Sequence, residues 1–172
     1  EKIADEILSK RPEFVPTKTL KGQILAAKKD YQKARTIFED LLKGEPESIV
    51  YNFMLGSLYY EQNDYENAKS FLSKALEKNP SHARARFMMA NIYYRQNDLF
   101  LAEDYVKRIL NNIPDHYQAN LLMGNIELAN NEFDRAKSIF EKTIKLDPEN
   151  PSAFFRLGLA QSAAKKNSAA LK

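Results

Sequence analysis

Two histidines and five glycines are the residues whose types and spacing first suggest chemistry in this chain. His82 and His116 are the only histidines, and their numbers differ by 34. A metal ion bound by both imidazoles would require ligand distances of about 2 Å. Residues at equivalent places in neighbouring helical units lie roughly 10 Å apart, because packed helix axes are 8–10 Å apart. We therefore interpret both histidines as loop residues beside a helix cap.

Catalytic chemistry has no candidate residues elsewhere in the sequence. Neither histidine has an evident acid partner or nucleophile for a Ser-His-Asp arrangement. The chain contains no cysteine, which excludes disulfides, zinc ribbons and thiol catalysis. We predict no catalytic residue, no metal site and no cofactor, and we do not expect an enzyme.

Four of the five glycines share the same 34-residue step. Gly22, Gly56, Gly124 and Gly158 occupy one place in it, and Ala90 takes the remaining place. A phosphate-binding loop needs glycines clustered at a turn before a helix, which this spacing does not provide. We predict that a missing side chain at this place lets two helices approach closely.

The prolines keep this period as well. Five of them follow it without a slip: Pro12, Pro46, Pro80, Pro114 and Pro148. A fixed period of this kind predicts an array of one supersecondary unit rather than a single globular core. Each proline disfavours helix in the residue before it, so a helix should end there.

One unit, residues 49–82, shows helical spacing on both sides of a turn. Leu55, Leu58 and Tyr59 lie at i, i+3 and i+4. The turn Gln62-Asn63-Asp64 then offers an asparagine, which tolerates the left-handed conformation, and an aspartate that can cap the next helix. Each unit is thus predicted to be helix, turn, helix. After the prolines, Ser81 and Asp115 are expected to cap the following helices.

These residues carry a family resemblance. Residues 49–82 resemble a tetratricopeptide repeat through Leu55, Gly56, Tyr59, Ala68, Leu72, Ala75 and Pro80. Residues 117–150 match it through Met123, Gly124, Ala136, Phe140 and Pro148, with Glu127 in place of the tyrosine. The resemblance implies an all-α fold, a right-handed α-solenoid of antiparallel helix pairs.

The register divides the whole chain, which we expect to form a single array over residues 1–172. Residues 1–14 are expected to be the second helix of a preceding repeat. Full repeats are predicted at 15–48, 49–82, 83–116 and 117–150. Residues 151–172 should form a first helix and the opening of a second. Neither end resembles a polar terminal cap, so we expect a fragment of a longer array, bacterial in style.

The resemblance also implies a binding surface, because first helices line the concave wall in this family. The residues expected to face that groove are Phe53, Ser57, Tyr60, Phe87, Asn91, Tyr94, Leu121, Asn125 and Phe155. Amides and a hydroxyl in this set can bond an extended peptide backbone, while the phenylalanines take apolar side chains. The alternative is that the aromatic residues only pack on their neighbours and the polar ones are solvated.

Family members that clamp a C-terminal carboxylate use conserved Lys, Asn and Arg positions. Of these, only Asn91 and Arg156 have counterparts here. A carboxylate clamp is therefore not expected.

The predicted function is a non-catalytic scaffold that binds a protein or peptide in the groove. One alternative is a structural spacer that self-associates through open solenoid ends in a multiprotein assembly, including one of the cell envelope or secretion. Another is the docking arm of a larger enzyme. The net charge of +3 does not indicate nucleic acid, and no apolar run predicts membrane insertion. Cytoplasm and periplasm remain equally open.

Overall fold

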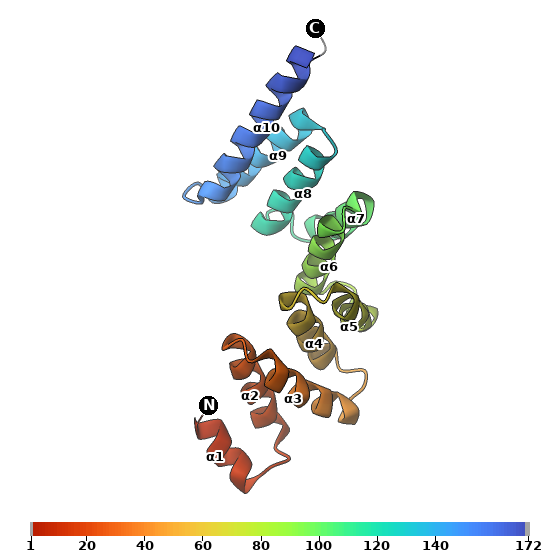
Figure 1. The fold of residues 1–172 in the computed structure, drawn as a ribbon, viewed down its shortest axis with the longest axis vertical. Coiled ribbons are helices and arrows are strands. Elements are labelled where there is room, and N and C mark those ends of the chain that lie inside the picture. The colour runs from red at the N-terminus through yellow and green to blue at the C-terminus, as the bar shows by residue number, and fades with distance from the viewer. Residues whose placement is uncertain (1, 171–172) are drawn as a thin grey trace. The chain divides into compact units, whose positions relative to one another are not determined.

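The computed structural model describes residues 2–170, with side chains to residue 167. Residues 1, 171 and 172, which the predicted array includes, lie outside the described part. Residues 2–170 form ten helices: α1 Lys2–Lys10, α2 Val15–Ala27, α3 Tyr31–Gly44, α4 Ile49–Glu61, α5 Tyr65–Lys78, α6 Ala83–Arg95, α7 Leu99–Leu110, α8 Tyr117–Ala129, α9 Phe133–Leu146 and α10 Pro151–Ala170 (Figure 1). None of them combines the length and hydropathy that crossing a bilayer requires.

Four helix pairs have the predicted organisation, α2 with α3, α4 with α5, α6 with α7, and α8 with α9. The turn inside three of these pairs contains an asparagine with positive φ, namely Asn63 at 59°, Asn97 at 59° and Asn131 at 63°. In the first pair Lys29 takes this conformation at 63°. The predicted left-handed turn is therefore confirmed.

The second helix of a pair starts at an aspartate cap in the first three pairs. The side chains of Asp30, Asp64 and Asp98 each accept a hydrogen bond from the backbone N–H three residues later. Such a cap contributes about 1 kcal/mol to helix stability. Glu132 makes no such bond at the start of α9. The longer second helices end shortly before their prolines, as α5 does at Lys78 before Pro80.

The last predicted repeat differs from this plan. Residues 151–170 form one continuous helix, so the expected opening of a second helix after a turn is wrong. At the turn positions Lys165 stands where the other repeats have Asn63 or Lys29, and Lys166 replaces the capping aspartate. Alanine and lysine in this segment are good helix formers, which explains why the helix continues.

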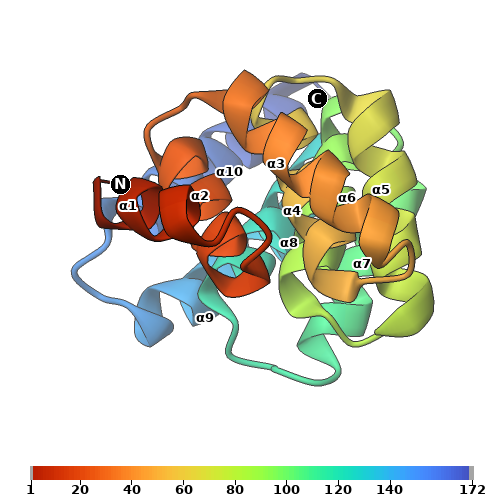
Figure 2. The ribbon, with the colours of Figure 1, turned by 90° about the horizontal axis from the view of Figure 1, so that it is seen from below.

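The chain clusters into two compact units, residues 1–85 and 86–172. In the first unit α1 packs on α2, and Figure 2 shows these two helices side by side. The core of this unit joins α2, α3 and α4 through Leu25, Phe38 and Leu55, none of which is more than 3% exposed.

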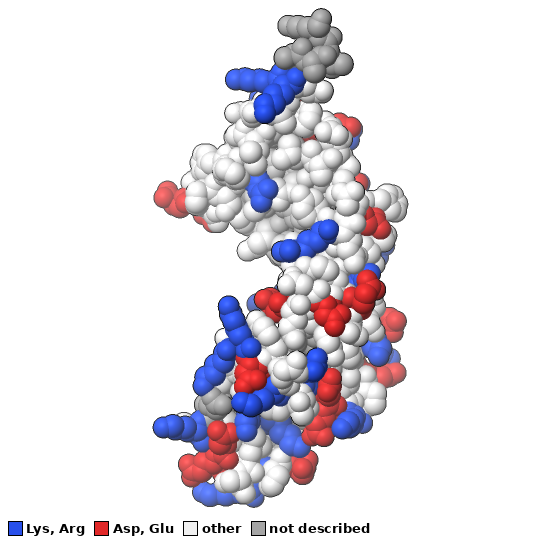
Figure 3. Space-filling model, in the orientation of Figure 1, with Lys and Arg blue, Asp and Glu red and all other residues white. Residues whose placement is uncertain are grey.

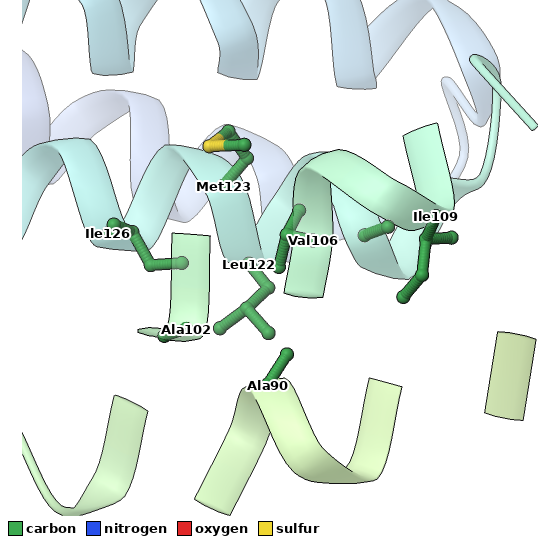
Figure 4. Close-up of a cluster of buried hydrophobic side chains, with 8 residues drawn as sticks. Ala90, Ala102, Val106, Ile109, Leu122, Met123 and Ile126 are labelled. Atoms are coloured by element: carbon green, nitrogen blue, oxygen red, sulfur yellow. The ribbon is translucent and has the colours of Figure 1, made fainter. Parts of the chain in front are cut away.

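The second unit has a core between α6, α7 and α8. Ala90, Val106, Ile109, Leu122 and Ile126 are among its buried side chains (Figure 4). A further cluster of Ala136, Phe140 and Ala160 joins α9 to α10. The prediction of one array over residues 1–172 stays a prediction.

Glycines within the helix pairs have the predicted packing role. An added Cβ at Gly22 would lie 2.7 Å from Phe38 Cζ, and one at Gly56 would lie 2.8 Å from Leu72 Cγ. Helices could not remain this close with a larger residue. Gly158 is the exception, because a Cβ there would meet no atom of the described residues within 4 Å. The reason is that residues 151–170 form one helix, so the described part of this repeat contains no second helix to pack against Gly158.

Candidate functional site

The nine predicted groove residues lie on the first helices of four repeats. Phe53, Ser57 and Tyr60 lie on α4 in the first unit. The remaining six belong to the second unit: Phe87, Asn91 and Tyr94 on α6, Leu121 and Asn125 on α8, and Phe155 on α10. Residues spaced at i, i+4 and i+7 share one face of a helix. Eight of the nine are half-buried and Phe155 is 66% exposed, so all retain surface for a partner.

Two of the phenylalanines are supported by the histidines. The ring centroids of Phe53 and His82 are 4.5 Å apart, and those of Phe87 and His116 are 6.0 Å apart. Each phenylalanine therefore has one side fixed by a neighbouring ring. One part of each ring packs and another is accessible, and the predicted role of these residues in binding stays a prediction.

The histidines themselves are the helix caps. His82 Nδ1 accepts a hydrogen bond from Ala85 N at 3.3 Å, and His116 Nδ1 accepts one from Ala119 N at 3.2 Å. Capping by Ser81 and Asp115 was therefore a wrong expectation. The N-cap is the residue directly before the first helical one, which Ser81 and Asp115 are not.

Ser81 and Asp115, which do not cap these helices, have other interaction partners. Ser81 N and Ser81 Oγ both donate to Asn79 Oδ1, at 3.2 and 3.0 Å. Asp115 Oδ1 lies 3.8 Å from Lys142 Nζ. In residues 2–170, moreover, no three His, Cys, Asp or Glu side chains gather as a metal site.

The polar residues of the predicted face are Ser57, Asn91 and Asn125. Two of them make hydrogen bonds within their own helices. Ser57 Oγ donates to Phe53 O at 2.8 Å, and Asn91 Nδ2 donates to Phe87 O at 2.9 Å. Asn125 differs, because its Oδ1 is buried and has no hydrogen-bond partner among the described residues. A buried acceptor without a partner carries a desolvation cost of about 1–3 kcal/mol.

The residues three positions further along these helices, Tyr60, Tyr94 and Leu128, pack partly on neighbouring side chains. The Tyr60 ring lies 6.2 Å from the Tyr65 ring. Tyr94 packs on the α6–α8 core, and Leu128 on the cluster that joins α9 to α10. The equivalent residue of the first repeat is Ala26, which is too small to do the same.

A pocket of about 270 Å³ lies beside Ala26 in the first unit. We call it the α2–α4 pocket, and it is lined by Ala26, Ala27, Lys29, Tyr31, Phe38, Met54, Ser57, Leu58 and Glu61. Sequence reasoning named Ser57 but missed the pocket. The available signal was an alanine at a place where the next two repeats have tyrosine.

Charge on this fold is mixed rather than gathered in one field. On the face shown in Figure 3, blue and red side chains alternate over the first unit, and the face over α8–α10 is mostly uncharged.

One carboxyl has a shifted pKa: burial raises the pKa of Glu127 above its ordinary value, and the nearby Glu103 carboxylate raises it further. Glu127 occupies the place of Tyr59 and Tyr93, which stack on aromatic rings of their own repeats.

Helix pairs that repeat along the chain are the defining feature of an α-solenoid repeat protein. Family models of the tetratricopeptide repeat match residues 15–47, 59–126 and 121–172. The chain belongs to the tetratricopeptide-repeat family. No curated protein matches the sequence significantly.

Solved structures with the same fold include three of particular interest. The MamA protein superposes with a TM-score of 0.80 at 21% identity, covering 93% of this chain and 87% of MamA. YrrB, described as a TPR protein with an unusual peptide-binding site, gives 0.77 at 17%, covering 94% and 84%. The first TPR of Spaghetti (RPAP3), bound to an HSP90 peptide, gives 0.64 at 20%, covering 68% and 93%. At these identities the likeness shows the fold alone.

Proposed function

We propose that this chain is a non-catalytic interaction scaffold that binds a protein partner, as an extended peptide or a helix, on the exposed face of its first helices. The observation that carries the proposal is that first helices in both units keep a partly accessible apolar side chain at the same repeat position, Phe53 in the first unit and Phe87, Leu121 and Phe155 in the second. Aromatic side chains of this kind supply most of the binding energy at protein interfaces.

The fold neighbours support a ligand of this class. YrrB is described as having a peptide-binding site, and the RPAP3 structure contains an HSP90 peptide. The carboxylate clamp is incomplete in this chain, because Phe87, Leu122 and Ser152 stand at positions where the clamp needs polar or basic side chains. The proposed ligand is therefore an internal segment with apolar side chains rather than a free C-terminus.

Polar contacts would be few and specific. The hydroxyl of Ser57 and the amide nitrogen of Asn91 already donate to their own helices. Asn125 Oδ1 has no partner but is buried, so a backbone N–H of the ligand reaches it only when the side chain rotates toward the surface. Apolar contacts then provide the affinity, and Asn125 orients the chain.

A random linear peptide library displayed on phage tests the proposal without a known partner. Peptides selected on the wild-type chain are expected to bind the double variant Phe87→Ala, Asn91→Ala at least about tenfold more weakly, as loss of an interface anchor requires. Circular dichroism should show that helicity is kept. Phe155→Ala, whose side chain is 66% exposed, gives a second variant with little effect on packing.

The matched control is Phe100→Ala. Phe100 is 79% exposed but lies on α7, a second helix, so its removal should leave affinity unchanged. The proposal is refuted if no peptide binds the wild-type chain above background. It is also refuted if Phe100→Ala weakens binding as much as the changes on the first helices.

A further inference from the structure

The α2–α4 pocket exists because one repeat lacks a side chain that its neighbours have. Ala26 of α2 corresponds to Tyr60 of α4, and Tyr31 corresponds to Tyr65, in each case 34 residues further on. In the second repeat the Tyr60 ring lies 6.2 Å from the Tyr65 ring. In the first repeat Ala26 has only a methyl group at the place of Tyr60, and Ala26 and Tyr31 both line the pocket.

The rest of the lining suits an apolar ring. Met54 and Ala27 contribute accessible apolar surface, and the buried side chains of Leu58 and Phe38 lie beneath it. Methionine is a flexible, polarisable side chain that makes favourable contacts with aromatic rings. The volume of about 270 Å³ is below the roughly 300–1,000 Å³ of sites for drug-sized ligands, so it suits one large side chain.

The pocket also opens onto the proposed binding face. Ser57, one of the nine predicted groove residues, lines it, and Ala26 and Glu61 lie on the same side of their helices. Lys29 and Glu61 are exposed lining residues of opposite charge. A ligand seated here would place a basic residue near Glu61 and an acidic residue near Lys29.

We propose that the α2–α4 pocket is an anchor subsite for one aromatic side chain of a peptide partner, which takes the place beside Tyr31 that the Tyr60 ring takes beside Tyr65. The inference rests on the proposed function and specifies the ligand: a peptide with a phenylalanine or tyrosine that has a basic residue on one side and an acidic residue on the other. The protein itself demonstrates the contact, because the second repeat supplies the same ring from its own sequence.

The decisive variant is Ala26→Tyr, which would fill the pocket from within as the second repeat does. Ala26→Leu is a milder version, since Leu128 occupies the equivalent place in the fourth repeat. Both should keep the helical circular dichroism spectrum and unfold at higher urea concentration, because they fill a space between helices. The matched control is Ala129→Tyr, which adds the same side chain at an exposed position on α8.

Two probes are used on each variant. The first is a titration with N-acetyl-phenylalaninamide, N-acetyl-tyrosinamide and N-acetyl-leucinamide, followed by NMR of the Ala26 methyl and the Tyr31 ring. The aromatic amides should give saturable shifts at both residues in the wild-type chain and in Ala129→Tyr. In Ala26→Tyr only the Tyr31 ring is followed, and it should show no saturable shift. The leucine amide should bind the wild-type chain more weakly than the aromatic amides do.

The second probe is the set of library peptides selected on the wild-type chain. They should be enriched in aromatic residues, and Ala26→Tyr should weaken their binding by about tenfold or more. If they bind Ala26→Tyr normally but lose affinity with Phe87→Ala, Asn91→Ala, the pocket inference is overturned and the proposed function stands. If no peptide is selected, the proposed function fails and the amide titration decides the pocket, which is overturned when Ala26 and Tyr31 do not shift.

Discussion

Adding one methyl group at Gly124 tests how this fold brings its helices together. A Cβ there would lie 2.7 Å from Phe140 Cζ and 2.8 Å from Phe140 Cδ1, and the Phe140 side chain is fully buried. Alanine is more favourable than glycine inside a helix by about 1 kcal/mol. Overpacking a core costs about 1–3 kcal/mol. Because the contacts fall below 3.0 Å against a fully buried ring, the overpacking cost should exceed the gain in helix propensity, and Gly124→Ala should destabilise the chain by up to about 2 kcal/mol.

The third repeat shows how the same clash is avoided. There Ala90 takes the glycine position and Val106 takes the position of Phe140, and both belong to one buried cluster (Figure 4). Phe140→Val alone should cost about 2–3 kcal/mol by opening a cavity. In Gly124→Ala, Phe140→Val the added methyl would meet a smaller partner. The double variant should be more stable than the sum of the two effects by about 1–2 kcal/mol.

Urea denaturation of the four proteins in this cycle, followed by circular dichroism, measures the coupling. Gly158→Ala is the matched control, since its Cβ would meet none of the described residues within 4 Å. It should raise stability by up to about 1 kcal/mol through helix propensity alone. Strict additivity of Gly124→Ala and Phe140→Val, or equal losses at Gly124 and Gly158, would refute the assigned packing role.

Two further predictions concern the histidine caps and the buried carboxyl. His116→Ala should destabilise the chain by about 1 kcal/mol because Ala119 N loses its cap acceptor, and His116→Asn, which restores an acceptor, should recover most of this in thermal unfolding. Equal stability of His116→Ala and the wild type would contradict the cap. Because the folded chain raises the pKa of Glu127, it holds that proton more tightly than the unfolded chain, so this residue's contribution improves as the pH falls through the raised pKa. Glu127→Gln should therefore stabilise the chain at neutral pH, by about 0.5 kcal/mol after solvent screening, and the gain should shrink towards about pH 4. A gain in urea stability that is constant with pH would contradict this account.

Local features of the fold were predictable because their causes lie within a few residues. Asn63 and Asn97 have positive φ, as an asparagine between two helices suggests, and Asp64 caps the helix that follows it. The close helix approach at Gly22, Gly56 and Gly124 also followed from their shared spacing. Caps after the prolines were assigned one residue too early, because the exact first residue of a helix is weakly encoded by local sequence.

The environment of the proposed binding residues was predictable only in part. Helical periodicity is sufficient to place Phe53, Phe87 and Asn125 on one face of their helices. It does not say that the donors of Ser57 and Asn91 are used by their own backbones, or that Asn125 Oδ1 is left without a partner. Those outcomes depend on rotamers and on neighbours from other helices.

The sequence by itself determined the unit, its length and its family, because a 34-residue period in prolines and glycines is a property of the chain and needs no coordinates. Tertiary structure decided what the exceptions to that period mean. Gly158 looks like an ordinary member of its column, yet none of the described residues would contact a Cβ there. Ala26 departs from its column in size, and only the structure shows that this leaves a pocket beside Tyr31. The physical reason is that free space belongs to no single residue: it depends on which side chains from other helices reach the same place.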